Sequence, residues 1–189
     1  MNMDETVAKL KRGVVELVSE ADLRERLATG KPLRVKLGVD PTSRDLHLGH
    51  TVVLNKLRAF QDLGHQAVLI IGDFTAQVGD PSGRDSTRPT LTFAEIKDNA
   101  ATYQDQAFKV LDPKKTEVVF NSDWLAPIFR VDKAIEAGSV LQKFLTKYSV
   151  LKLLQREDFA RRREQELPIT LAELLYPLFQ AYDSVAVKA

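Results

Sequence analysis

The sequence predicts an α/β fold: an open parallel sheet with helices on both faces, followed by a helical C-terminal part. Three short apolar segments carry this prediction, at residues 33–39, 67–71 and 116–120. Each has the length of a strand, and stretches with helical spacing separate them. Alternation of strands and helices favours a parallel sheet, in which ligands bind beyond the carboxyl ends of the strands.

The composition indicates a globular protein with one domain. The chain has 189 residues, of which 44% are hydrophobic and 28% are charged, and its net charge is +1. This charge does not indicate a nucleic-acid partner, so any such contact needs a local patch. Without cysteine, disulfide scaffolds and thiolate metal sites are excluded, and a cytoplasmic location is favoured. The longest apolar run, 67–71, is too short to cross a membrane, and the N-terminus does not resemble a signal peptide.

The domain is expected to have three parts: N-terminal helices over residues 1–31, the sheet over 32–121 and a helical part over 122–189. Apolar residues at helical spacing predict a first helix over residues 7–18. Ser19 is suited to cap a second helix that continues to Leu27 and ends before Gly30. A third helix follows the first strand and ends near Gly64.

The second half of the sheet region alternates loop and helix. Residues 72–90 form a polar loop with glycine and proline, and Thr92 with Glu95 forms a capping box that opens a helix to Leu111. From residue 131 onward the pattern is helical, and residues 156–166 are so densely charged that a solvated helix face is expected. Thr170 begins a second capping box before the last helix.

Two histidines stand where the first strand is followed by a helix. His47 and His50 lie at the expected helix N-terminus, where free backbone N–H groups and the helix dipole favour an anion. Gly49 between them allows a ligand to approach the backbone, and a neutral imidazole can donate a hydrogen bond to phosphate. The alternative is a common turn with a capping or surface histidine.

The loop over residues 72–90 contains a second candidate set. Asp80 could accept a hydrogen bond from an ammonium or hydroxyl group, and Arg84 and Arg88 could hold a phosphate. The alternative is an ordinary surface loop with solvated arginines.

The third candidate set lies on the last predicted helix. Tyr176, Gln180 and Asp183 follow each other at i, i+4 and i+7, so they share one narrow arc, and leucines with Tyr182 occupy the opposite side. They could line a pocket for a small polar ligand, although any amphipathic surface helix has this pattern. No metal site is predicted, because His47, His50 and Asp45 have no third histidine or glutamate placed to complete a ligand set.

Taken together, these segments resemble the class I aminoacyl-tRNA synthetases, and most closely the bacterial tyrosyl-tRNA synthetases. His47-Leu48-Gly49-His50 is similar to the first signature of the class, and residues 35–89 resemble the tyrosine enzymes throughout. Residues 176–183 resemble their amino-acid pocket helix. The resemblance covers essentially the full chain and implies a Rossmann-like sheet.

The resemblance also implies roles for individual residues. One group would hold ATP and another would bind tyrosine, while Arg84 and Arg88 on a mobile loop would reach the pyrophosphate. The ATP group is Gly38, Asp40, Thr42, His47, Gly49 and His50, with Thr42, the two histidines and the two arginines as the catalytic residues. The tyrosine group is Asp80 and Asp183 at the phenol, Tyr176 and Gln180 at the ammonium, and Lys36.

The implied reaction has two steps. Tyrosine attacks the α-phosphorus of ATP, which releases pyrophosphate and leaves tyrosyl adenylate, and the 3′-terminal hydroxyl of tRNA(Tyr) then takes the tyrosyl group. Catalysis would consist of positioning and electrostatic stabilisation, with Mg²⁺ accompanying ATP. The resemblance further implies a homodimer, for which Phe129, Val140, Leu141, Phe144, Leu145 and Leu151 are candidate interface residues.

Three departures from the family pattern affect these expectations. Lys36 stands where many bacterial relatives hold the phenol with a tyrosine, and Arg84 stands where many have lysine. The later Gly-Gly-x-Asp-Gln and Lys-Met-Ser-Lys-Ser stretches and the anticodon-binding domain are not found in these 189 residues. The sequence is therefore expected to be the front part of a longer ligase, with little activity of its own in tyrosine-dependent ATP–pyrophosphate exchange.

Two other functions remain open at this point. A small nucleotidyltransferase with the same histidine motif would be complete at this length, but it does not explain the helix with Tyr176, Gln180 and Asp183. A non-catalytic module that holds tyrosine or a partner chain is the second alternative.

Overall fold

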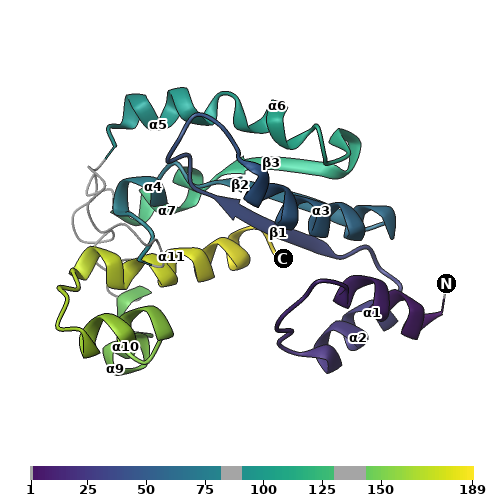
Figure 1. Cartoon of the computed structure of the whole chain (residues 1–189), viewed down its shortest axis with the longest axis horizontal. Coiled ribbons are helices and arrows are strands. Elements are labelled where there is room, and N and C mark those ends of the chain that lie inside the picture. The colour runs from purple at the N-terminus through teal and green to yellow at the C-terminus, as the bar shows by residue number, and fades with distance from the viewer. Residues whose placement is uncertain (1, 82–90, 130–143) are drawn as a thin grey trace.

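Three parallel strands form the centre of the molecule (Figure 1). The structure is a computed structural model that describes residues 2–81, 91–129 and 144–189. The strands β1 (Arg34–Val39), β2 (Gln66–Ile71) and β3 (Thr116–Phe120) lie in the order β1-β2-β3. The predicted strands are confirmed to within one residue at each end, and so is the parallel sheet.

One face of the sheet is covered by three helices, α3 (Leu48–Asp62), α5 (Phe93–Ala100) and α6 (Tyr103–Ala107). Side chains alternate between the two faces of a strand, and the odd-numbered residues of β2 point to this side. They belong to a buried cluster whose members come from α3, β2 and the α5–α6 segment: Leu54, Leu57, Ala67, Leu69, Ile71, Ala100, Tyr103, Ala107 and Leu111. The short 3₁₀ turn η1 (Pro113–Lys115) leads from this layer into β3.

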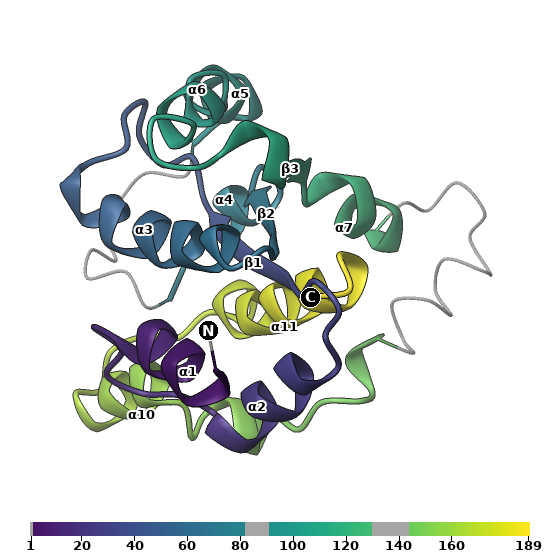
Figure 2. The same ribbon diagram turned by 90° about the vertical axis from the view of Figure 1, so that its right-hand side faces the viewer.

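The opposite face is covered by α7 (Ser122–Phe129) and the long α11 (Leu171–Ala186), as Figure 2 shows for α11. Val68 and Ile70 of β2 are buried there with Val187, which follows α11. A second cluster joins α7 and α11 to α4 (Thr75–Val78) and α9 (Val150–Leu153), and Phe179 is at its centre. Helices on both faces are therefore confirmed, and helices follow the sheet as expected.

The N-terminal part differs from the prediction. Instead of one helix over residues 7–18, α1 (Met3–Lys11) ends early, and Val15 is fully exposed beyond it. Gly13 has a φ of 72°, in the left-handed region where a helix cannot continue. Lys56 of α3 donates to the carbonyl oxygens of Leu10 and Arg12, which satisfies the end of α1. The second helix, α2 (Glu20–Ala28), is capped by Ser19 as predicted.

The helix predicted from Thr92 to residue 111 is divided into α5 and α6. Its capping box is present, but hydrogen bonds from Asn99 to the Pro41 carbonyl and from Thr102 to the Arg44 carbonyl pull this segment toward the loop after β1. Such side-chain bonds to a neighbouring backbone compete with helical geometry.

The last third of the described chain is helical. The capping box at Thr170 opens α11 as predicted, and α10 (Glu157–Glu164) carries the charged stretch. Arg162 on α10 forms an ion pair with Glu173 of that capping box, which fixes the two helices to each other. None of the helices in the described part of the chain has the length and apolar character needed to cross a bilayer.

Candidate functional site

A polar residue follows each of the three strands, and the parallel arrangement brings all three to one edge of the sheet. Asp40 follows β1, Asn121 follows β3, and Asp73 comes two residues after the end of β2. The helices α3, α4 and α7 begin close to these strand ends, as Figure 1 shows. This edge is where ligands bind in open α/β sheets.

Asp40 joins three parts of the fold through its carboxylate. One oxygen, Oδ1, accepts a hydrogen bond of 2.7 Å from Thr75 Oγ1 of α4, and Oδ2 accepts one of 2.8 Å from Tyr176 Oη of α11. Burial raises the pKa of Asp40 to about 6, although these two hydrogen bonds act in the opposite direction. The Asp40–Tyr176 contact spans 136 positions of sequence and brings the last predicted candidate helix to the first strand.

Gly72 leaves the space that the Asp40 carboxylate and the Thr75 hydroxyl occupy. A Cβ atom at Gly72 would lie 1.9 Å from Asp40 Oδ1 and 2.4 Å from Thr75 Oγ1. The carboxylate therefore occupies the volume of the missing side chain. Any larger residue at position 72 would displace either Asp40 or α4.

Three carboxylates act on the phenol of Tyr176. Burial and the charges of Asp40, Asp80 and Asp183 all raise the pKa of Tyr176 far above its usual range. Tyr176 is therefore a neutral donor to Asp40, and its oxygen retains a lone pair that can accept a further hydrogen bond. The charge of Asp80 also raises the pKa of Asp40, so Asp80 lies near enough to act electrostatically on both members of this pair. We call Asp40, Asp80, Tyr176 and Asp183 the carboxylate pocket.

Asp183 is only 5% exposed and is held by residues of the β3–α7 segment. Trp124 Nε1 donates to Asp183 Oδ1 at 2.8 Å. Burial raises the pKa of Asp183, while hydrogen bonds from Trp124 and Asn121 and the charge of Lys36 lower it. The carboxylate is thus kept in place by donors that were not identified as site residues from the sequence.

Asn121 connects the carboxylate pocket to the end of the sheet. Its side-chain oxygen accepts from the Phe74 backbone N–H at 3.0 Å, and its Nδ2 donates to Thr75 Oγ1 at 2.9 Å. Asp73 holds the start of α7 by accepting from both the N–H and the hydroxyl of Ser122. A sequence signal for both residues existed, since each follows a strand as Asp40 does.

Gln180 and Lys36 are placed differently from Tyr176 and Asp183. Gln180 is exposed, whereas Tyr176 and Asp183 are buried, so only part of the predicted common arc faces the interior of the protein. The backbone carbonyl of Gln180 accepts a 2.8 Å hydrogen bond from Lys36 Nζ of β1. Burial lowers the pKa of Lys36, and the nearby charge of Asp183 raises it.

The two histidines form a compact pair at the start of α3. His47 is the N-cap, and its Nδ1 accepts from the Gly49 N–H at 3.1 Å, while His50 Nδ1 accepts from the His47 N–H at 3.2 Å. The ring centroids are 4.1 Å apart. Burial and the neighbouring His47 lower the pKa of His50. Because Nδ1 is an acceptor in both rings, each neutral imidazole carries its proton on Nε2 and can donate it to an anion.

Gly38, Thr42 and Gly49 were also predicted to bind ATP, and all three lie in the described part of the chain. A Cβ on Gly49 would lie 2.8 Å from His47 Cε1, so a larger residue there would shift the His47 ring. Gly38 is exposed with open space beside its Cα, and the Thr42 N–H donates to the Asp40 carbonyl in an exposed turn. Arg84 and Arg88 lie outside the described residues.

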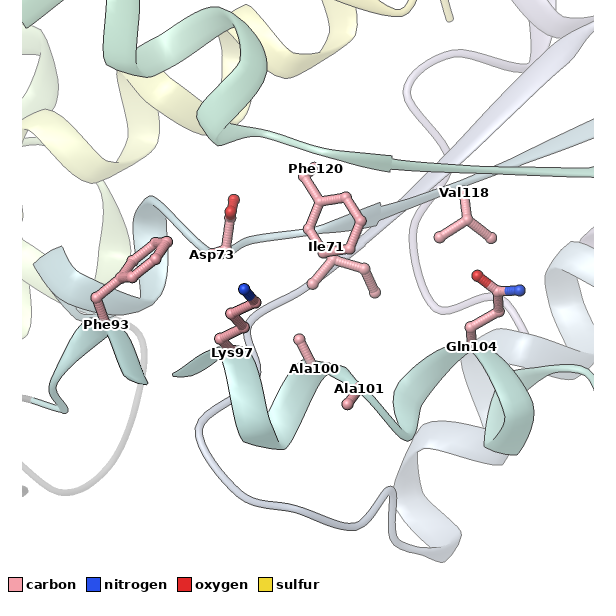
Figure 3. A pocket seen from close by; sticks show the side chains of 9 residues that line it. All are labelled: Ile71, Asp73, Phe93, Lys97, Ala100, Ala101, Gln104, Val118 and Phe120. Carbon is pink, nitrogen blue, oxygen red and sulfur yellow. The ribbon is translucent and has the colours of Figure 1, made fainter. Parts of the chain in front are cut away.

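A separate cavity of about 360 Å³ lies between the α5–α6 segment and the ends of β2 and β3 (Figure 3). Its walls are mainly apolar, and Lys97, Gln104 and Asp73 supply polar groups. Of the predicted site residues that the structure describes, none lines this cavity. Within the described ranges, no group of three His, Cys, Asp or Glu residues is arranged to hold a metal ion.

The candidate interface residues have mixed environments. Phe144 is 8% exposed and packs inside the chain against Phe179, whereas Leu151 is largely exposed. Phe129 stacks on Phe74 within the chain and is partly exposed. Residues 140 and 141 lie outside the described residues.

Sequence comparison relates the chain to one enzyme group. The tyrosine–tRNA ligase of Thermotoga maritima is 56% identical over 189 residues, which are 100% of this chain and 45% of that protein. The tyrosine–tRNA ligase of Carboxydothermus hydrogenoformans is 54% identical over 184 residues, which are 95% of this chain and 43% of that protein. The chain thus spans less than half the length of these curated relatives.

Solved structures agree on the fold. A C-terminally truncated mitochondrial tyrosyl-tRNA synthetase from Aspergillus nidulans matches with a TM-score of 0.75 and 26% identity, over 94% of this chain and 52% of that one. A tyrosyl-tRNA synthetase from Archaeoglobus fulgidus, complexed with L-tyrosine, has the same fold, with a TM-score of 0.77 and 22% identity over 100% of this chain and 54% of that one.

The family model described as tRNA synthetases class I (W and Y) matches residues 28–189. This range contains the sheet, the histidine pair and the carboxylate pocket, and the match decides against a small nucleotidyltransferase. The chain belongs to the class I tRNA synthetases of the tryptophan and tyrosine group.

Proposed function

We propose that this chain is the front part of a tyrosine–tRNA ligase, which activates tyrosine with ATP to tyrosyl adenylate and then transfers the tyrosyl group to tRNA(Tyr). The observation that carries the proposal is the hydrogen bond from Tyr176 to Asp40, because it joins the amino-acid helix to the strand that leads to the histidine pair. The names of the relatives and the family match support it.

The ammonium group of tyrosine would bind in the carboxylate pocket. The Tyr176 hydroxyl donates a hydrogen bond to Asp40, so its oxygen can accept one from the ammonium. We assign Asp80 to this ammonium end, and not to the phenol as the resemblance implied, because its charge acts on Asp40 and Tyr176. Gln180, at the rim, would contribute its side-chain oxygen. The other end of the substrate, its phenol, would lie toward Asp183, where the buried carboxylate accepts from the ring hydroxyl. Phenylalanine would leave Asp183 without that partner.

The phosphates of ATP would bind at the start of α3. The Nε2–H groups of His47 and His50 and the positive end of the helix dipole favour an anion there without a permanent positive charge. Gly38, Gly49, Thr42 and Asp40 would border the nucleotide, and Arg84 and Arg88 would reach the pyrophosphate. Mg²⁺ would accompany ATP through its phosphates.

In the first step, a carboxylate oxygen of tyrosine forms a bond to the α-phosphorus as the bond to the bridging oxygen of the leaving pyrophosphate breaks. Negative charge grows on the phosphate oxygens, and donors that are already oriented stabilise it at little reorganisation cost. His47 and His50 are oriented by their Nδ1 hydrogen bonds, so this chain supplies fixed donors. The tRNA step, a homodimer and a cytoplasmic location remain part of the proposal.

A calorimetric experiment tests whether the histidine pair and the carboxylate pocket form one site. We expect this chain to bind a non-hydrolysable tyrosyl-adenylate analogue more tightly than tyrosine, and tyrosine at least about tenfold more tightly than phenylalanine. His47→Asn should weaken binding of the analogue and leave tyrosine binding nearly unchanged. Asp183→Asn should weaken binding of both ligands.

The control is Asp105→Asn, which removes an exposed carboxylate from α6, a helix on the face of the sheet opposite α11. Equal affinity for tyrosine and phenylalanine would refute the tyrosine pocket. Tyrosine binding without any gain from the adenylate part would favour the non-catalytic module instead.

A further inference from the structure

The segment over residues 41–46 leads from β1 to the histidine pair and has no regular secondary structure. Figure 1 shows the chain after β1 running toward α5 and α6. Backbone groups of an irregular segment need partners outside it, and here side chains of the α5–α6 segment supply them. The Pro41 carbonyl accepts from Asn99 Nδ2 at 3.0 Å, and the Ser43 carbonyl accepts from Tyr103 Oη at 2.8 Å. The α5–α6 segment therefore holds the first half of residues 41–46.

Gln106 of α6 holds the second half, directly before the histidine pair. Its Oε1 accepts from the Leu46 N–H at 2.8 Å. Its Nε2 donates to the Arg44 carbonyl at 3.1 Å and to Thr102 Oγ1 at 2.8 Å. Thr102 Oγ1 in turn donates to the same Arg44 carbonyl at 2.8 Å. One amide thus uses its acceptor and both of its donors in this contact, which fixes two backbone groups of the segment.

The direction of the His47 ring depends on this segment. His47 is the N-cap of α3 and has non-helical backbone angles, so the chain that enters the helix sets its orientation. His47 is exposed, and the hydrogen bonds of the two rings lie within residues 47–50. Within the described part of the chain, no side chain of another element forms a hydrogen bond with either ring. The Leu46 N–H that Gln106 holds is one residue before the His47 N–H that donates to the second ring.

We propose that Gln106 is a positioning residue for phosphate binding, which sets the direction of the His47 Nε2–H donor from α6 without contacting the ligand. This inference rests on the proposed function, because it takes a polyphosphate to be the ligand of the histidine pair. An anion gains most from donors that are oriented before it binds, so a displaced donor lowers the affinity. The carboxylate pocket should be unaffected, because the Asp40 carboxylate is held by Thr75 and Tyr176 and not by α6.

Separate calorimetric titrations of the folded chain with inorganic pyrophosphate and with tyrosine test the inference. Gln106→Met nearly keeps the length of the side chain and removes its amide. We expect its affinity for pyrophosphate to fall about tenfold and its affinity for tyrosine to change by less than about twofold. The matched control is Gln104→Met on the same helix. The Gln104 side chain is exposed and makes no hydrogen bond among the described residues, so this control should alter neither affinity.

Thr102 provides a second pair of variants, because it shares the Arg44 carbonyl with Gln106 and accepts from its amide. Thr102→Val removes the hydroxyl at nearly constant shape and should lower the affinity for pyrophosphate about threefold. Thr102→Ser keeps a hydroxyl that can donate and accept, and it should retain the affinity of the unmodified chain. This pair tests the same contact in a chain that keeps Gln106.

NMR spectra of the histidines separate positioning from a general loss of stability. In Gln106→Met the imidazole signals of the histidine pair should shift, whereas those of His65, beyond the far end of α3, should not. Unchanged pyrophosphate affinity in both Gln106→Met and Thr102→Val would overturn the inference and leave the proposed function intact. An equal fall in tyrosine affinity would show a general structural role and would also overturn it. Absence of pyrophosphate binding by the unmodified chain would overturn the proposed phosphate site together with this inference.

Discussion

The two ends of the proposed site, the histidine pair and the carboxylate pocket, are built in different ways. His47 and His50 lie within four consecutive residues, are held by local backbone hydrogen bonds and stand in a partly exposed helix start. The carboxylate pocket combines residues from the loop after β1, the loop after α4 and α11, and its hydrogen-bonded pair Asp40 and Tyr176 is 136 positions apart. One end depends on local geometry and the other on the whole fold.

The electrostatic environments differ in the same way. The histidine pair offers neutral donors and a helix dipole to an anion, whereas the carboxylate pocket surrounds Tyr176 with acidic groups and favours a cation. A zwitterionic substrate and a polyphosphate can be bound next to each other only if the two environments stay separate. The space beside Gly72 and the hydrogen bond from Thr75 to Asp40 keep the carboxylate pocket in place.

The largest expected effect comes from closing the space beside Asp40. In Gly72→Ala, the new Cβ would overlap Asp40 Oδ1 and Thr75 Oγ1, so we expect a loss of about 3 kcal/mol in the free energy of unfolding and loss of tyrosine binding. Urea denaturation and calorimetry measure the two effects. The histidine pair should retain its affinity for inorganic pyrophosphate in the folded variant.

Gly38→Ala is the matched control for stability, because its Cβ would meet nothing within 4 Å and its backbone needs no left-handed φ. Its free energy of unfolding should change by less than about 0.5 kcal/mol. Equal stability losses in the two variants would show that overlap with Asp40 is not the cause.

The next effect is a pH dependence with opposite signs at the two ends. The pKa of Asp40 is raised to about 6 in the folded state, so its contribution to stability is present at low pH and is lost as pH rises through about 6. The difference of roughly two units between the folded pKa of Asp40 and its ordinary pKa corresponds to about 3 kcal/mol in the free energy of unfolding. As pH rises from 4.5 to 7.5, the free energy of unfolding of Asp40→Asn should therefore increase by about 2 kcal/mol relative to that of the unmodified chain. This figure allows for the partial exposure of Asp40.

His50 should show the reverse trend. Its pKa is lowered in the folded state, so protonation favours the unfolded chain, and stability should fall as pH decreases through the ordinary value of 6.5. The effect should be below about 1 kcal/mol because His50 is partly exposed. Unfolding of Asp40→Asn and His50→Gln at several pH values measures both trends, and a pH-independent difference for either variant would contradict its assignment.

The sequence was sufficient for the features that depend on neighbouring residues. The three strands, the Ser19 cap and the capping boxes at Thr92 and Thr170 follow from short patterns, and they are present. The first helix was predicted too long because apolar spacing continues past Gly13, where the backbone is left-handed. The helix over residues 92–111 was predicted as continuous because its break depends on hydrogen bonds to the distant loop after β1.

In the candidate site, too, local patterns identified single residues but not the contacts between distant ones. The side chains of His47, Tyr176 and Asp183 were identified from their sequence positions, but the contact between Tyr176 and Asp40 was not, since no local pattern specifies a partner 136 positions away. Asn121 and Trp124 were missed because a single amide or indole has no spacing pattern. The position of Asn121 directly after β3 was an available signal, whereas Trp124 lies within α7 and had none.

Two substitutions separate the two roles of His47. As the N-cap of α3 it accepts from the Gly49 N–H, and as a proposed phosphate ligand it donates from Nε2. His47→Ala should lose both roles and cost about 1 kcal/mol in the free energy of unfolding. His47→Asn should keep the cap through its side-chain oxygen but lose the Nε2 donor, because its amide group is shorter than the imidazole and does not extend as far. Thermal unfolding and pyrophosphate titration of both variants measure the two roles. If His47→Asn binds pyrophosphate as well as the unmodified chain does, the histidine is only a cap, and the anion is held by the backbone at the start of α3.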